Sequence, residues 1–191
     1  MERRDVLIRT LTAEALELVT AFDAGWNEHV RLSRERTLPL LRESPAPFDR
    51  KQFSPGHITA SAIVLSPDRA NVLLVHHHRL NRWLQPGGHI EAEDTGLCDA
   101  AAREVREETG ILVTQAQLPL LAGISVHRIP ATAKEPEHWH HDLLFSMIAT
   151  STKYRISSEA PEVVWCQLDK LPDRELGGDL IAIIRRSAAF H

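Results

Sequence analysis

Three glutamates in the middle of the chain have the spacing of a metal site. Glu104, Glu107 and Glu108 stand at i, i+3 and i+4, so on a helix their carboxylates share one face. Like charges at this spacing destabilise a helix unless something neutralises them. Carboxylates on one rigid element suit a hard divalent cation, and Mg²⁺ is often held by one or two of them together with waters and substrate phosphates. The spacing therefore predicts a metal-bearing helix, with a solvated acidic face as the alternative.

The neighbouring residues favour a helix that packs against a core. An apolar sector adjoins the acidic one and consists of Cys98, Ala101, Ala102 and Val105. The remaining sector carries Arg103 and is expected to face solvent. Gly87 and Gly88 precede the helix, and because glycine allows a close approach of the backbone, the Gly88 carbonyl could complete a metal shell.

The segment from Gly88 to Ile111 resembles the Nudix box, G-x5-E-x7-R-E-U-x-E-E-x-G-U, in which U is an aliphatic residue. Its second half, from Arg103 to Ile111, matches at every fixed position. Its first half departs from the pattern: Asp94 replaces a glutamate, and eight residues instead of seven separate it from Arg103. Asp94 is expected either to pair with Arg103 or to act as a helix N-cap.

The resemblance to the Nudix hydrolases covers roughly residues 53–189. It implies an α/β fold, the Nudix α/β/α sandwich with a mixed sheet. It also implies a pyrophosphohydrolase that cleaves a diphosphate linkage in a nucleoside diphosphate derivative or nucleotide, with Mg²⁺ or Mn²⁺ as cofactor. The expected partner is thus a small-molecule nucleotide or diphosphate substrate.

The same resemblance implies roles for individual residues. Glu104, Glu107 and Glu108 would hold the metal, which clamps the diphosphate and lowers the pKa of a bound water. A carboxylate beside that water takes its proton as it attacks phosphorus, and the candidates are Glu107 and Glu159, which also reaches the metal. Arg103 is expected to orient the glutamates through charge-assisted hydrogen bonds without touching the substrate.

Two further groups of candidates lie outside the acidic stripe. Glu159 is preferred to Glu162 because Pro161 favours an extended or turn geometry that lets Glu159 leave the sheet, and a solvated loop acid is the alternative. Arg79 and Arg82 could meet a substrate phosphate or remain loop charges. His89, directly after the glycine pair, is expected to face the substrate.

Histidine is unusually frequent, with eleven residues in the chain. His76 and His78 would share one face of an extended strand, and His138 and His140 one face of another. If these strands lie near each other, the two pairs could bind zinc. Contact with a phosphate or a base, and a plain structural role, stay open for both clusters.

The elements that must position these residues fall into two parts. Up to Ser44 an apolar stripe recurs at three and four residues; it comprises Leu16, Leu18, Val19, Phe22, Trp26, Val30 and Leu32. The stripe predicts a helical stretch from Thr12 to about Ser44, which Pro39 kinks or ends. We therefore expect an N-terminal helical extension, residues 1–52, before a Nudix hydrolase domain, residues 53–191.

Within the second part the pattern alternates between strands and helices. Expected strands are Ile58–Ser66, Asn71–His78, Leu118–Ile129, Leu143–Thr150 and Val163–Leu168, and expected helices are Thr95–Thr109 and Gly178–Ala189. The stretch from Ser66 to Arg69 reads as a hairpin turn.

Composition narrows the class of protein. A chain of 191 residues, 43% hydrophobic and 25% charged, is typical of one globular domain with a short extension. A net charge of −4 argues against a stable nucleic-acid complex. The apolar runs are too short to cross a membrane, and no apolar h-region with a small-residue cleavage site follows the charged N-terminus, so a cytoplasmic protein is expected. Cys98 and Cys166 are expected to be reduced thiols. A homodimer is an arrangement that the sequence leaves open.

Two other functions are compatible with the same fold. An isopentenyl-diphosphate isomerase-like enzyme would use histidine and glutamate metal ligands but needs a cysteine in its own motif. A non-catalytic nucleotide-binding Nudix module would not need intact box glutamates. The sequence does not reveal the leaving group.

Overall fold

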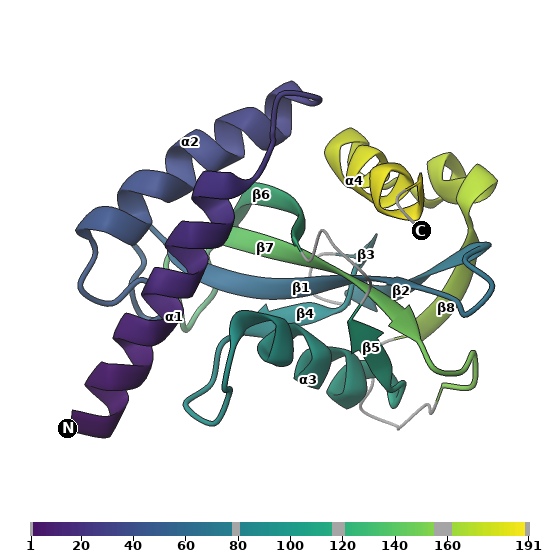
Figure 1. Ribbon diagram of the computed structural model, residues 1–191. Helices are drawn as coiled ribbons and strands as arrows, with labels where there is room; N and C mark the ends of the chain where they lie inside the picture. The colour runs from purple at the N-terminus through teal and green to yellow at the C-terminus, as the bar shows by residue number, and fades with distance from the viewer. Residues whose placement is uncertain (1, 78–80, 116–120, 155–161, 190–191) are drawn as a thin grey trace.

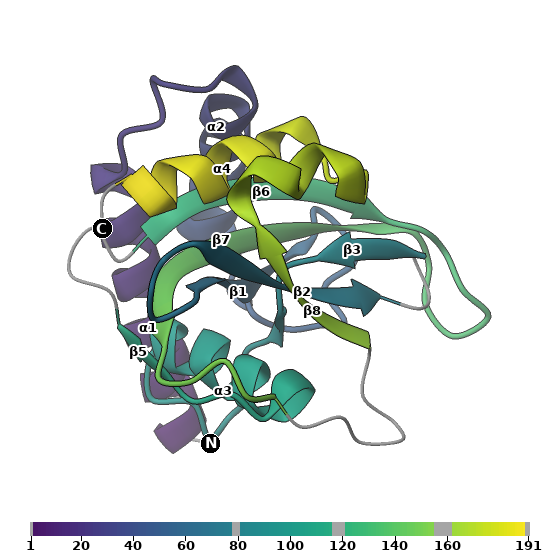
Figure 2. The same cartoon turned by 90° about the vertical axis from the view of Figure 1, so that its right-hand side faces the viewer.

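The computed structural model describes residues 2–77, 81–115, 121–154 and 162–189. Its centre is one mixed β-sheet with helices on both faces (Figures 1 and 2). In chain order the elements are α1 (Glu2–Ala21), α2 (Glu28–Glu43), β1 (His57–Leu65), β2 (Asn71–His77), β3 (Arg82–Leu84), β4 (Gly87–His89), α3 (Leu97–Thr109), β5 (Val113–Gln115), β6 (Leu121–Ile129), β7 (His138–Ala149), β8 (Glu162–Gln167), the 3₁₀ helix η1 (Leu168–Arg174) and α4 (Gly178–Ala189). The predicted α/β architecture with a mixed sheet and preceding helices is confirmed.

The two long strands β1 and β7 run parallel at the centre of the sheet, in a register that sets His57 opposite His140. The other edge of β1 is shared: β4 pairs with it from Thr59 to Ser61, and β2 pairs with it at Leu65. β3 and β8 extend the sheet beyond β2, while β5 and β6 pair with β7. The shared edge brings the glycine pair of β4 to the middle of the sheet.

All nine residues of β1 are buried, because helices cover both faces of the sheet. Alternate residues of the strand enter two different cores. Ile58, Ala60, Ala62 and Val64 pack in the cluster that includes α3. Ile63 and Leu65 pack in the cluster that includes α4 (Figure 1).

The N-terminal helices pack onto this sheet and share its core. Leu11, Ala15 and Val19 of α1, spaced four residues apart, are buried together with residues of α3 and β1. The expected helical stretch differs in three ways from the structure. It begins at Glu2, it is broken between α1 and α2, where the Asn27 side chain caps α2, and it continues through Pro39 to Glu43.

The apolar periodicity also predicted the buried residues of these helices only in part. Val19 and Val30 are fully buried, but Leu32 is 42% exposed. The buried residues of α2 include the polar Ser33 and Thr37, whose side chains contact β6 and β7. Polar contacts of this kind leave no trace in an apolar pattern.

The strands and helices of the second part follow the expected bounds closely, and α4 spans Gly178–Ala189 as predicted. The hairpin turn is present, with the Arg69 N–H donating to the Ser66 carbonyl at 2.7 Å. β7 begins at His138 instead of Leu143, because its polar first half pairs with both β1 and β6. The short strands β3, β4 and β5 and the 3₁₀ helix η1 were not predicted. Residues 78 and 118–120 of the expected strands lie outside the described residues.

Both cysteines, Cys98 and Cys166, are buried thiols outside any disulfide, as expected. Among the described residues, no helix combines the length and the apolar character that crossing a bilayer requires.

Candidate functional site

The helix α3 carries the box residues and is held at both ends. Cys98, Ala101 and Val105 bury one side of it against the sheet. Its C-terminus ends at Gly110, whose φ of 70° favours glycine. At its N-terminus the Leu97 N–H lies 3.3 Å from the Glu14 carboxylate of α1, so the N-terminal extension contributes a cap to the box helix. Burial raises the pKa of that Glu14 carboxyl.

Glu104 and Glu108 lie one turn apart on the side of α3 that faces β4. A Cβ atom at Gly88 would come within 2.5 Å of Glu104 Oε1, so only glycine lets this carboxylate approach the strand. The Gly87 N–H donates to Glu108 Oε2 at 3.2 Å. Both carboxylates therefore lie against the backbone of Gly87 and Gly88.

The surroundings of these two carboxylates disfavour their negative charge. Burial, reinforced by the charge of Glu104, raises the pKa of Glu108 to about 7. Burial also raises the pKa of Glu104, although the Arg103 guanidinium partly offsets it. A nearby cation would reverse both effects, so the arrangement has the electrostatics of a cation site.

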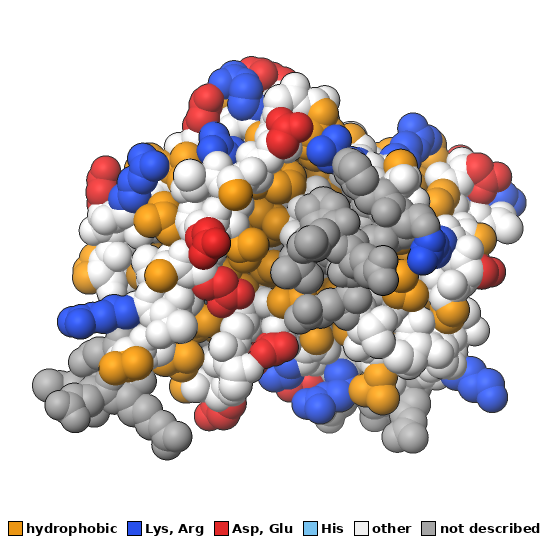
Figure 3. All heavy atoms as spheres, viewed as in Figure 1, with side chains coloured by type: hydrophobic (Ala, Val, Ile, Leu, Met, Phe, Trp, Pro, Cys, Tyr) orange, Lys and Arg blue, Asp and Glu red, His pale blue; other side chains and the backbone are white. Residues whose placement is uncertain are grey.

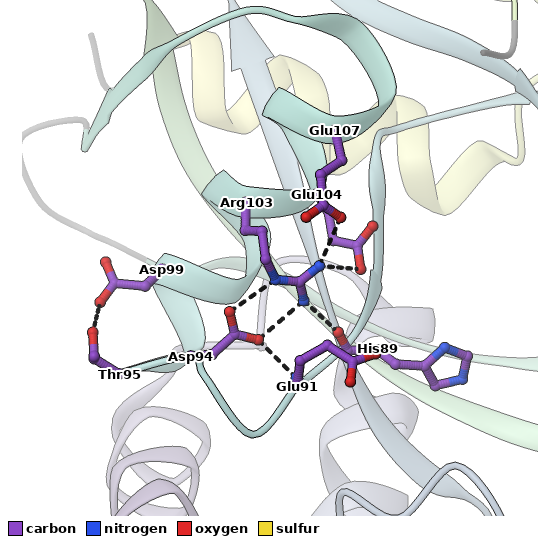
Figure 4. A network of polar contacts seen from close by, with 8 residues as sticks. All are labelled: His89, Glu91, Asp94, Thr95, Asp99, Arg103, Glu104 and Glu107. Carbon is purple, nitrogen blue, oxygen red and sulfur yellow. Dashed lines mark hydrogen bonds and ion pairs between the residues drawn. The ribbon is translucent and has the colours of Figure 1, made fainter. Parts of the chain in front are cut away.

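Arg103 joins the box helix to the loop before it (Figure 4). Its Nε and Nη2 atoms donate to the two oxygens of Asp94 at 2.9 and 3.0 Å. Its Nη1 atom donates to Glu104 and Glu107, both at 3.0 Å, and Nη2 donates to the His89 carbonyl at 2.8 Å. These hydrogen bonds, those to Asp94 foremost, raise the pKa of Arg103 and keep it charged.

Asp94 therefore pairs with Arg103 despite the additional residue between them. It is not the helix N-cap, which is Gly96, and its Oδ2 also accepts the Glu91 N–H at 2.7 Å. The assignment of Arg103 to the solvated sector is wrong, since its side chain is only 17% exposed. Three carboxylates and a carbonyl surround it, and their attraction outweighs the cost of burial.

Several other predicted site residues are exposed or lie outside the described residues. Glu107 is 53% exposed beside Arg103. Arg82 is exposed on β3, opposite His77. Arg79 and Glu159 lie outside the described residues. Glu162 is exposed at the start of β8.

The condition for the two histidine pairs to converge, strands that lie near each other, is not met for His76, and His78 lies outside the described residues. His76 lies on β2, which β1 separates from β7, and its ring packs against Trp83. His138 and His140 instead meet His57 and His89. The sequence could not indicate this partnership, because it depends on the parallel pairing of β1 with β7.

A buried carboxylate on β7 was also missed. Asp142 is 1% exposed, and its Oδ1 accepts hydrogen bonds from the Thr59 and Ser61 hydroxyls, both at 2.9 Å. Its Oδ2 accepts from the Gln85 amide at 3.0 Å. Because Ser61 is paired with Gly87 across the two strands, this network helps to fix β1, the strand against which the glycine strand β4 pairs. An isolated aspartate in a polar half-strand gives no signal of such a role.

A cavity of about 760 Å³ opens beside the box loop. Its walls are Leu7, Ile8 and Leu11 of α1, Pro45, Ala46, Phe48, Asp49 and Arg50 of the following loop, and His89, Ile90, Glu91 and Ala92. The N-terminal extension thus lines a pocket next to the candidate site. On the face seen in Figure 3, acidic and hydrophobic side chains lie next to each other along α1 and α3.

Part of the chain resembles a known protein in sequence. Phosphatase NudJ of Escherichia coli (strain K12) is 42% identical over 59 residues, which are 31% of this chain and 37% of NudJ. The match therefore spans little more than a third of that relative's length.

Two solved structures resemble the fold. A NUDIX-family hydrolase from Clostridium perfringens has a TM-score of 0.53 at 19% identity, over 71% of this chain and 97% of its own. The NUDIX domain of Shewanella oneidensis NrtR, solved in complex with ADP ribose, has a TM-score of 0.53 at 21% identity, over 76% of this chain and 94% of its own. At such identities the likeness concerns the fold alone.

A family model described as the NUDIX domain matches residues 55–186, most of the chain. The matched region holds the sheet, the glycine pair and the box helix α3. With its box residues on a helix that packs against the glycine strand, the chain belongs to the Nudix domain family.

Proposed function

We propose that the protein is a metal-dependent pyrophosphohydrolase that cleaves a diphosphate linkage in a nucleoside diphosphate derivative or nucleotide. One observation carries the proposal. Glu104 and Glu108 lie one turn apart and largely buried, and burial with the Glu104 charge raises the pKa of Glu108 to about 7. Such a pair costs stability unless a cation neutralises it, and hard oxygen ligands on one helix suit Mg²⁺ or Mn²⁺.

The residues around this pair fit a bound divalent cation. Glu104 and Glu108 would hold it, with Glu107 and the Gly88 carbonyl as further oxygen ligands. The absence of a side chain at Gly88 leaves room for the Glu104 carboxylate against β4. The Gly87 N–H engages Oε2 of Glu108, and Oε1 would be the oxygen offered to the cation. When bound, the cation would neutralise charge on the diphosphate and acidify a water molecule.

The protein's own groups then divide the remaining work. Arg103 holds Glu104 and Glu107 in position through its 3.0 Å hydrogen bonds. Glu107 and Glu159 are the candidate bases that take the proton from the attacking water. Glu107 is exposed and close to the Glu104 and Glu108 carboxylates. Arg79, Arg82 and His89 are the candidates for contacts with substrate, and His89 lines the cavity beside the box loop.

A substrate screen tests the proposal. The purified chain is incubated with Mg²⁺, Mn²⁺ or excess EDTA and with nucleoside triphosphates, nucleotide sugars, dinucleotides and ADP-ribose, and the products are identified. We expect turnover of at least one compound, dependent on the divalent cation, with products that locate the cleaved diphosphate bond. Binding without turnover across the panel would favour a non-catalytic module. Isopentenyl diphosphate, followed by NMR, tests the isomerase alternative.

A further inference from the structure

Four histidines from three strands meet on one face of the sheet, and we refer to His57, His89, His138 and His140 as the histidine cluster. The strands β4, β1 and β7 lie side by side. The register sets His57 opposite His140, while His138 lies two residues earlier on the same face of β7. His89 reaches the cluster from the end of β4. The sheet itself therefore gathers the four rings.

Two pairs of ring nitrogens have nearly the spacing of neighbouring metal ligands. His57, His138 and His140 each offer one ring nitrogen, and these atoms lie within 4.8 Å of one another. The Nε2 atoms of His138 and His140 are 3.2 Å apart, and those of His57 and His89 are 3.1 Å apart. In a tetrahedral zinc site with bonds of about 2.0–2.1 Å, neighbouring ligand nitrogens are roughly 3.3–3.4 Å apart.

Two of the rings are oriented by backbone carbonyls. His138 Nδ1 lies 2.8 Å from the Pro136 carbonyl, and His57 Nδ1 lies 3.3 Å from the Gln52 carbonyl. A carbonyl only accepts hydrogen bonds, so Nδ1 carries the proton and the Nε2 lone pair points into the cluster. Metal-ligating histidines have this arrangement, in which the second ring nitrogen donates to a carbonyl or carboxylate.

Burial keeps the rings in the form that binds metal. His57 and His138 are 0% and 4% exposed. Burial lowers the pKa of His57, that of His89 to about 4 and that of His140 to about 2, so these imidazoles are neutral at neutral pH. Neutral imidazole nitrogen is a ligand for zinc, copper and nickel, whereas Mg²⁺ prefers oxygen.

We propose that His57, His138 and His140, with His89 as the fourth ligand, form a binding site for a divalent transition-metal ion of the zinc type. The site is separate from the carboxylates of the box helix. Four protein ligands would close the coordination shell, which is typical of structural zinc. The ion would tie the starts of β1 and β7 to the end of β4.

The site would also act on the box through His89. The His89 carbonyl accepts a 2.8 Å hydrogen bond from Arg103, while its ring belongs to the histidine cluster. Fixing the ring would therefore hold the carbonyl that helps to position Arg103. A metal-bound His89 ring is not available to the substrate, so this assignment replaces the substrate contact expected from the sequence.

Zinc binding by the full chain, prepared without an oligohistidine tag and stripped of metal, tests the site. Equilibrium dialysis against Zn²⁺ at low micromolar free concentration should give one equivalent per chain. His57→Asn and His140→Asn should each weaken Zn²⁺ binding by at least about 100-fold, since loss of an outer-shell partner alone costs 10–100-fold. The control His29→Asn, at an exposed position of α2, should bind like the wild type.

A double variant, Glu104→Gln with Glu108→Gln, separates this site from the box. It should still bind one equivalent of Zn²⁺ when hydrolysis is lost. Failure of the zinc proposal can therefore be told apart from failure of the proposed hydrolase function. X-ray absorption on the wild-type complex should show a nitrogen shell at about 2.0–2.1 Å, a result that does not depend on any variant folding.

Three results would overturn the proposal. The first is no bound Zn²⁺, which would leave the paired nitrogens as N–H···N hydrogen bonds. The second is unchanged binding in folded His57→Asn and His140→Asn. The third is loss of binding in the double glutamate variant, or an oxygen-dominated shell, which would assign the ion to the box.

Discussion

The carboxyl group of Glu108 couples the candidate site to the stability of the fold. Its pKa is raised by burial from 4.5 to about 7. Between these values the folded chain holds a proton that the unfolded chain has released, so stability falls as pH rises. The penalty is absent below about pH 4.5, is complete above about pH 7, and is relieved by a bound cation.

Urea unfolding in EDTA should reveal this penalty. Between pH 5 and pH 8 the wild type should lose on the order of 1–3 kcal/mol of unfolding free energy relative to Glu108→Gln, which cannot ionise. Glu17→Gln, at an exposed position of α1, should behave like the wild type. Equal pH dependence in Glu108→Gln and the wild type would show that Glu108 ionises normally.

Asp94 provides a second test at the scale of a residue. Its side chain is 4% exposed and neutralises the largely buried Arg103. Asp94→Asn keeps the shape and removes the charge, so it should destabilise the protein by about 1–3 kcal/mol, less than a fully unpaired charge because two glutamates remain. Thermal or urea unfolding measures the change. Asp173→Asn, exposed and of the same type, should stay within about 0.5 kcal/mol of the wild type, and a similar value for Asp94→Asn would refute the pairing.

Kinetics test the choice of Glu159 over Glu162. As a candidate base, Glu159 should matter for the chemical step, so Glu159→Gln should lower kcat with little change in KM. Glu162, exposed at the start of β8, should tolerate the same change. Equal and small effects of the two substitutions would leave Glu107 as the base.

At the scale of the element, the N-terminal helices are part of the core. Removing residues 1–44 would uncover the partners of Leu11, Val19 and Leu40, which are at most 3% exposed. It would also remove the Glu14 carboxylate that caps α3. We expect the truncated chain to aggregate or change its oligomeric state in light scattering. A soluble product with unchanged association state would show the segment to be dispensable.

Point substitutions separate packing from chain length. Val19→Ser should destabilise the full chain, because it places a hydroxyl where a fully buried side chain packs. Leu32→Ser, at a residue 42% exposed, should have little effect. Comparable losses would contradict the packing of α1 against the sheet.

The sequence predicted features that depend on residues close together in the chain, and missed features that depend on residues far apart in it. The box helix and α4 were predicted because helical periodicity is local, and the Glu104–Glu108 pairing follows from it. The histidine cluster and the Asp142 network were missed, since they depend on strands distant in sequence that pair only in the folded sheet. The break between α1 and α2 was missed because apolar residues continue across it.

At the scale of the whole molecule, the glycine strand β4 lies between the two proposed sites. Gly88 lies against Glu104 on one side, and His89, the next residue, turns its ring to His57 on the other. The two sites thus use opposite faces of one short strand. This arrangement explains how an imidazole cluster and a carboxylate site could coexist a few residues apart.

The most direct test of the central claim is hydrolysis of the best substrate from the screen in H₂¹⁸O. With Mg²⁺ or Mn²⁺ the wild type should place one ¹⁸O on a phosphate product. EDTA should abolish turnover, and Glu104→Gln and Glu108→Gln should each lower kcat by at least about 100-fold while the fold is retained, with Glu17→Gln as the control. Undiminished turnover in EDTA or in either variant would contradict the assignment of Glu104 and Glu108 as the metal-bearing pair.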